Sequence, residues 1–128
     1  MWRWLCYNDE RAESLWERWY CAADDAVKGK HETVFDILEA RQIWTTPYSK
    51  KLGDGLVEIR IRGEIQHRIL GYFSPEKGFT ILLICTHKGR VYSPRDAIKT
   101  ARKRMKLITE GKANAFICKR PEAFSCPC

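Results

Sequence analysis

"GLVEIRIRGEIQHRILGYF", residues 55–73, contains the clearest structural pattern in the chain. Its first half alternates apolar and charged side chains, which is typical of a strand that packs one face on a core. The apolar set is Val57, Ile59 and Ile61, and the charged set is Glu58, Arg60 and Arg62. Arg68 follows on the next apolar run. We therefore expect a small sheet that turns a row of arginines to one face.

The pattern extends outward into three predicted strands, at about 56–62, 66–74 and 79–87. The links around Gly63 and around residues 74–78 are short enough for hairpins. The third run, "FTILLIC", is apolar on both faces, which favours a central strand. Residues 45–55 carry Pro47, Gly53 and Gly55 and are predicted to be a loop.

Helical periodicity flanks the strands. One helix is predicted from about Asp9 to Lys28, ended by Gly29, and a second from about Thr33 to Arg41. A third is predicted over residues 94–110, where Ser93 is a candidate cap. Residues 2–7 allow a short first strand. The expected fold class is α+β, with two N-terminal helices on a mainly antiparallel sheet of three to four strands and a C-terminal helix. The sheet face without the two helices, where the arginines lie, is then partly open.

The composition suits one compact unit. The chain has 128 residues, of which 45% are hydrophobic, enough for one core. We expect a single domain over residues 1–111 and a tail of unknown role over residues 112–128. Because the sequence has neither a signal-peptide pattern nor a run of about eighteen apolar residues, a cytoplasmic protein is expected.

The charge is unevenly distributed. The chain carries a net charge of +7, with −4 over residues 1–40 and +11 over residues 41–128. A basic half of this kind favours a polyanion such as nucleic acid, although an acidic protein partner or a merely solvated basic surface is equally compatible with charge alone.

The six cysteines are expected to be reduced, because no secretory signal accompanies them. Cys85 lies in an apolar run and is predicted to be a small buried side chain. Cys118, Cys126 and Cys128 could bind a metal with Cys21 or His31, but the spacing is weak evidence and free thiols are favoured. No metal and no cofactor are therefore expected.

Four segments, taken in order, resemble one protein family. They are "LGDGLVEIRI" (52–61), "RILGYF" (68–73), "ILLICTHKG" (81–89) and "SPRDAIKTARKR" (93–104). Together they are similar to the phage-derived, HigB-like toxins of the RelE/ParE toxin–antitoxin superfamily, over about residues 33–106. The resemblance implies a RelE/ParE-like fold, a cognate antitoxin that is usually a small helix-turn-helix protein, and cleavage of mRNA, typically on the ribosome. The ParE-like branch acts instead on DNA gyrase.

RNA can be cut without a metal, because its 2′-OH can attack the neighbouring phosphate. The protein must then neutralise charge on the phosphate and move protons, and arginine forks suit the first task. The candidate catalytic residues are Arg60, Arg68, His87, Lys88 and Tyr72. The candidate RNA-binding residues are Arg62, Lys50, Lys51, Arg95, Lys99 and Arg102.

Each candidate also has a plain structural interpretation. Glu58 can simply pair with an arginine, His87 can be an ordinary strand-end histidine, and Tyr72 can be a core residue. Tyr92 is a weaker candidate than Tyr72. No carboxylate–histidine pair is evident in the sequence, which leaves open a gyrase-directed toxin or a non-catalytic nucleic-acid-binding protein.

Overall fold

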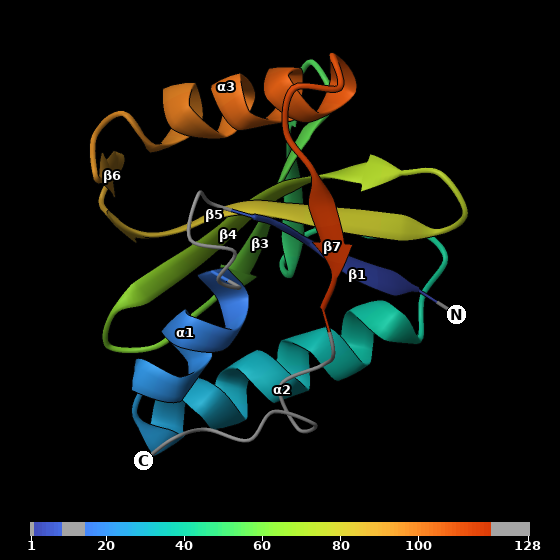
Figure 1. Cartoon of the computed structure of the whole chain (residues 1–128). Coiled ribbons are helices and arrows are strands. Elements are labelled where there is room, and N and C mark those ends of the chain that lie inside the picture. Colours follow the sequence, from blue (N-terminus) through green and yellow to red (C-terminus); the bar gives the residue numbers. More distant parts are fainter. Residues whose placement is uncertain (1, 9–14, 119–128) are drawn as a thin grey trace.

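The structure, a computed structural model, describes residues 2–8 and 15–118. These residues form three helices and seven strands (Figure 1). In chain order they are β1 (Arg3–Tyr7), α1 (Leu15–Ala22), α2 (Asp25–Glu39), β2 (Ser49–Gly53), β3 (Leu56–Ile61), β4 (Gln66–Ser74), β5 (Gly78–Lys88), β6 (Val91–Ser93), α3 (Ala97–Thr109) and β7 (Ala115–Ile117).

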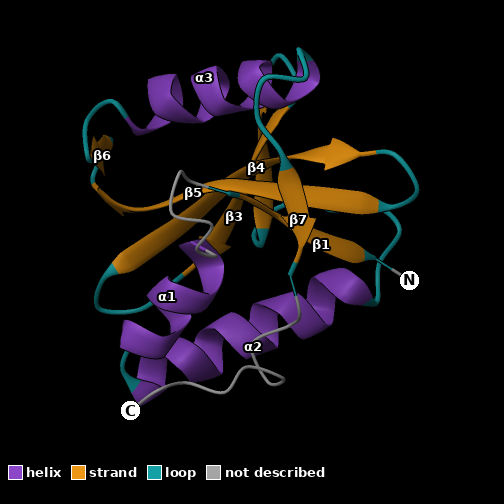
Figure 2. Ribbon diagram, viewed as in Figure 1, coloured by secondary structure: helices purple, strands orange, loops and turns teal. Residues whose placement is uncertain are grey.

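The strands form one mixed sheet, shown in Figure 2, in the order β2-β3-β4-β5-β1-β7, with β6 paired to β5 off this path. β1 runs parallel to β5, and the other pairs are antiparallel. The predicted fold class was therefore wrong. The sheet has seven strands within the described residues, not three to four, and it dominates the fold.

The missed strands are short and depend on distant partners. β2 lies in the segment predicted as a loop, where Ser49 pairs with Ile59 of β3. β7 lies in the predicted tail and pairs with β1 across more than a hundred residues of sequence. Local patterns do not report such pairings, because strand propensity depends on neighbours in the sheet. β3, β4 and β5 lie within about one residue of the predicted strands.

The helix boundaries also differ from the prediction. The break between the first two helices lies at Asp24, whose carboxylate accepts a hydrogen bond from the Val27 amide at 2.9 Å. This cap starts α2 eight residues earlier than predicted and leaves Gly29 inside the helix. Ser93 belongs to β6 and does not cap α3, which begins after Asp96.

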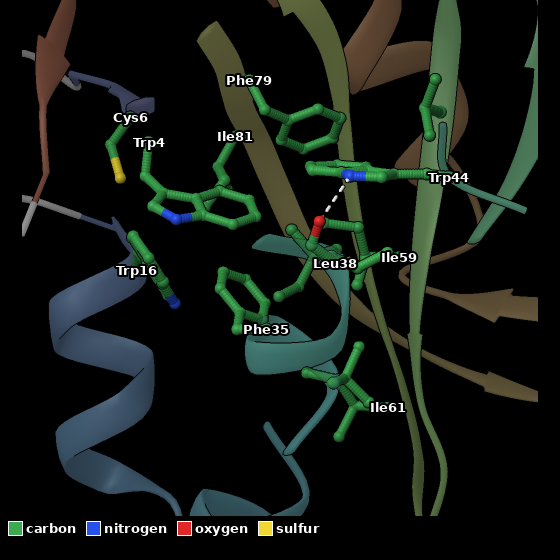
Figure 3. Close-up of a cluster of buried hydrophobic side chains, with 13 residues drawn as sticks. Trp4, Cys6, Trp16, Phe35, Leu38, Trp44, Ile59, Ile61, Phe79 and Ile81 are labelled. Atoms are coloured by element: carbon green, nitrogen blue, oxygen red, sulfur yellow. Dashed lines mark hydrogen bonds between the residues drawn. The ribbon is translucent and has the colours of Figure 1, made fainter. Parts of the chain in front are cut away.

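Helices cover both faces of the sheet. α1 and α2 pack on one face around an aromatic cluster that includes Trp4, Trp16, Phe35 and Trp44, in which the Trp44 indole donates a hydrogen bond to the Leu38 carbonyl at 2.9 Å (Figure 3). The strand residues predicted to face a core, Val57, Ile59 and Ile61, join this cluster. The predicted inward face of this strand is therefore confirmed.

α3 covers part of the second face. Ala97 and Ala101 pack on Leu56, Leu70, Leu82 and Cys85. Cys85 is a buried free thiol, as predicted. The arginines of this face are not part of this apolar contact, and they line one cavity together with Ser93 of β6.

A disulfide joins Cys6 of β1 to Cys118, which follows β7, with their Cα atoms 5.9 Å apart. The expectation of reduced thiols was therefore wrong for this pair. Cys126 and Cys128, the other candidates of the tail, lie outside the described residues. Across residues 2–8 and 15–118, none of the helices has the length and apolar character needed to cross a membrane.

Candidate functional site

Glu58 is the centre of the arginine-bearing face. Its carboxylate accepts hydrogen bonds from the Tyr92 hydroxyl at 2.9 Å and from Arg60 Nε at 3.2 Å. Arg68 Nε lies 3.1 Å from the same carboxylate, as an ion pair without hydrogen-bond alignment. The strand pairing explains the cluster, because Arg60 and Arg68 are direct cross-strand partners and Glu58 is two residues from Arg60 on the same face.

The three charged side chains differ in exposure. Those of Glu58 and Arg68 are 2% and 7% exposed, whereas that of Arg60 is 20% exposed. Burial lowers the pKa of Arg68, the Glu58 carboxylate opposes this effect, and the charges of Arg60 and Arg62 add to it. A guanidinium so enclosed has little surface left for a ligand. The structure therefore places Arg68 in the support of the site and Arg60 at its surface.

A basic cavity opens beside this cluster. It has a volume of about 550 Å³ and lies between the β3–β4 turn and the end of β5. Its charged and titratable lining residues are Arg60, Arg62, Glu64, Arg68, His87 and Lys88. Because Arg68 is largely enclosed, Arg60, Arg62 and Lys88 are the cations that can meet a ligand here, against the one carboxylate of Glu64, and this makes the cavity suited to an anion of phosphate type.

A smaller cavity of about 310 Å³ continues from the basic cavity and shares Arg60 and His87 with it. Lys50, Arg90, Glu58 and Tyr92 also line the smaller cavity. The two hollows together form a basic tract with Arg60 and His87 between them. A polyanion longer than one phosphate can therefore meet several cations along this tract.

His87 is held at this junction by the β5–β6 hairpin. The hairpin pairs His87 with Tyr92, and their rings meet edge to face with centroids 4.7 Å apart. Burial and the hydrogen bond to Glu58 raise the pKa of Tyr92, so its hydroxyl stays a donor. Tyr92 thus links the imidazole to the Glu58 cluster, a more central place than the sequence indicated.

Tyr72 lies elsewhere. It has the same parity as Arg68, but it pairs with Leu56 and Thr80 and packs on the core beneath α3. Burial raises the pKa of Tyr72, against a smaller opposite effect of a hydrogen bond with Thr80. Four residues of strand separate Tyr72 from Arg68 by about 13 Å, so a shared face does not bring them together.

The predicted RNA-binding residues also separate. Lys50 pairs with Glu58 and lines the smaller cavity, whereas Lys51 pairs with Val57 and so faces the other side of the sheet. Arg95 and Lys99 are exposed near the start of α3.

The Arg102 side chain makes structural contacts with the β2–β3 turn. It donates to the carbonyls of Leu52 and Gly53 at 3.3 and 3.2 Å and lies 3.5 Å from the carboxylate of Asp54. These contacts hold α3 on the β2–β3 turn.

Arg90 was not among the predicted site residues. It follows Gly89, whose φ of 62° allows the tight turn that folds β6 back on β5. The segment "HKGRVY" (87–92) contains the sequence signal for this hairpin, a glycine between two short segments that can each form a strand. Recognising the hairpin would have placed Arg90 and Tyr92 next to His87.

Within residues 2–8 and 15–118, no three histidine, cysteine or acidic side chains gather in a group suited to a metal ion.

A comparison with protein families finds a match to the family model described as "Phage derived protein Gp49-like (DUF891)", over residues 18–106. No curated protein and no solved structure matches the chain. The matched range includes every cation that lines the two basic cavities.

Proposed function

The chain belongs to the phage-derived Gp49-like family, which is a RelE/HigB-like toxin family, and from this premise we propose that it is the HigB-like toxin of a type II toxin–antitoxin pair. We propose further that it is an endoribonuclease that cleaves mRNA on the ribosome without a metal and so inhibits translation. The observation that carries this proposal is the basic tract around Arg60 and His87.

In this reaction the 2′-OH of the RNA attacks the adjacent phosphorus, the 5′-oxygen leaves, and a 2′,3′-cyclic phosphate forms. Arg60, Arg62 and Lys88 neutralise the charge that gathers on the phosphate oxygens in the transition state. Arg60 is suited to this task because Glu58 fixes its Nε while part of its side chain stays exposed. Preorganised cations of this kind stabilise a transition state more than mobile ones do.

His87 carries the proton transfer in this proposal. An imidazole can accept the proton of the 2′-OH or donate one to the leaving oxygen. Its contact with Tyr92 orients the ring towards the hollows shared with Arg60. Glu58 is engaged by Tyr92, Arg60 and Arg68, so its part is to position these groups.

The proposed partners are the ribosome-bound mRNA and a small helix-turn-helix antitoxin. Arg95 and Lys99 are exposed on the basic face at the start of α3, where ribosomal RNA or an acidic antitoxin segment finds positive charge. Purification of the protein together with the product of an adjacent reading frame tests the antitoxin.

The nuclease is tested with purified protein and mRNA, with and without ribosomes, in EDTA. We expect cleavage that persists in EDTA, and a loss of about a hundredfold or more in His87→Ala, as general acid–base catalysis contributes about that much. Lys77→Gln, in the turn at the other end of β4 and β5, is the matched charge control and should cleave normally. Intact RNA under both conditions contradicts the proposal, and stabilised gyrase–DNA complexes would point to the ParE-like alternative.

A further inference from the structure

An apolar groove of about 560 Å³ lies on the other side of Arg60 and Arg62 from the basic cavity. One wall is formed by α2, with the exposed residues Ala26 and Gly29 and the buried Val34, and the other is formed by Pro47 and Tyr48 before β2. Apart from Arg60 and Arg62, none of the residues that line this groove takes part in the proposed cleavage. The surface that lines it is more apolar than that of the two basic hollows.

Gly29 lies at the wall of the groove. It lies inside α2, where glycine lowers helix stability relative to alanine. A Cβ built on Gly29 meets no atom within 4 Å, so packing does not require glycine at this position. The glycine therefore leaves free space at the wall of the groove and makes the groove accessible to a test by substitution.

The groove and the basic cavity share Arg60 and Arg62. A strand that places a phosphate against these guanidinium groups from the cavity can place the adjacent base in the groove. A nucleobase has apolar faces and polar edges, and this groove combines apolar surface with the polar side chains of Asp25, Lys30 and Thr33. Asp25 can accept a hydrogen bond from an exocyclic amine, and Lys30 can donate one to a ring nitrogen or carbonyl.

We propose that this groove, which we call the base groove, binds one nucleobase of the RNA strand whose phosphate lies in the basic cavity. The inference rests on the proposed function and adds a subsite to it. This subsite contacts a base, whereas the basic cavity contacts only phosphate. Binding in the base groove positions the strand along Arg60 and Arg62. Because Asp25 and Lys30 border it, the base groove also distinguishes between bases.

The test compares two uncleavable probes with equal phosphate number, a 2′-O-methyl RNA hexamer and a hexamer of abasic spacers. Binding is measured for the wild type, Gly29→Phe and Gly29→Ala. We expect the wild type to bind the RNA hexamer about tenfold more tightly than the abasic one, because the contact with one base typically improves the affinity by about that factor. Gly29→Phe fills the base groove and should lose most of this preference, while it binds the abasic hexamer as the wild type does. Gly29→Ala should behave as the wild type.

The outcomes separate the two proposals. If the wild type binds neither hexamer, the proposed RNA site fails. If Gly29→Phe keeps the preference, or loses the abasic hexamer as well, the base groove is overturned while the proposed function stands. Ala26→Phe blocks the same groove from the adjoining turn of α2 and gives an independent result if Gly29→Phe does not fold.

Discussion

The substitution Glu58→Gln tests the centre of the site, because it removes one charge and almost no volume. Glu58 and Arg68 are both less than a tenth exposed, and their charged groups lie 3.1 Å apart. The glutamine can still accept the hydrogen bond of Tyr92, which Glu58 accepts at 2.9 Å. The main effect of Glu58→Gln is therefore to leave the buried guanidinium of Arg68 without its counter-charge.

Removing one partner of a buried ion pair costs about 3 to 5 kcal/mol. The Arg60 pair adds little, because its side chain is 20% exposed and solvent screens it. Since glutamine retains a polar contact, we expect the lower end, a loss of about 3 kcal/mol in the free energy of unfolding and of about 10 °C in Tm.

Urea denaturation followed by tryptophan fluorescence measures this loss. A double-mutant cycle with Arg68→Met isolates the pair, and we expect a coupling energy of at least about 2 kcal/mol. A coupling below about 0.5 kcal/mol, or a Glu58→Gln protein as stable as the wild type, would refute the view that Glu58 holds the arginines in place.

Three other predictions concern single residues. Gly71→Ala should lower the free energy of unfolding by about 3 kcal/mol, because a Cβ there overlaps the Thr80 carbonyl and lies 2.6 Å from the Phe79 ring. Gly29→Ala should instead raise the free energy of unfolding by about 0.5–1 kcal/mol, because a Cβ there meets no atom within 4 Å. Equal effects of the two substitutions in urea denaturation would contradict this. Burial lowers the pKa of His67 below 6.5, so the folded protein favours the neutral imidazole. The contribution of the neutral imidazole to stability is therefore lost as the pH falls from 6.5 through the pKa of the folded state. An NMR titration of His67 with a midpoint at or above 6.5 would be inconsistent with this. Burial raises the pKa of the Cys85 thiol to about 12, so iodoacetamide at about pH 8 should label the Cys85 peptide only after unfolding, as peptide mass spectrometry can show.

The sequence predicted best what depends on neighbouring residues. Alternation placed Ile59 in the core and Arg60 on the opposite face, and the structure confirms both positions. The start of α2 was predicted too late, because a helix end was predicted at Gly29. In the structure the side chain of Asp24 caps the start of α2, and Gly29 is accommodated inside the helix. β1 joins the sheet beside β5 through a parallel pairing that no local pattern reports.

At the site, too, the sequence predicted what local pattern determines but not what tertiary contacts determine. Parity assigned Arg68 and Tyr72 to one face, but the distance along the strand separates them and α3 covers Tyr72. Arg68 is paired with Glu58, which also accepts a hydrogen bond from Tyr92, and Tyr92 reaches this cluster through the β5–β6 hairpin. The roles of all the candidate residues in binding and catalysis stay predictions.

The claim that the basic cavity binds the RNA backbone is tested most directly by the salt dependence of binding. The affinity of an uncleavable single-stranded RNA falls with salt by a slope of about 0.7 per phosphate contact. We predict that Arg62→Gln and Lys88→Gln each reduce the slope by about 0.7, whereas Lys77→Gln leaves it unchanged. Equal slopes in all four proteins, or an equal reduction in Lys77→Gln, would contradict the claim.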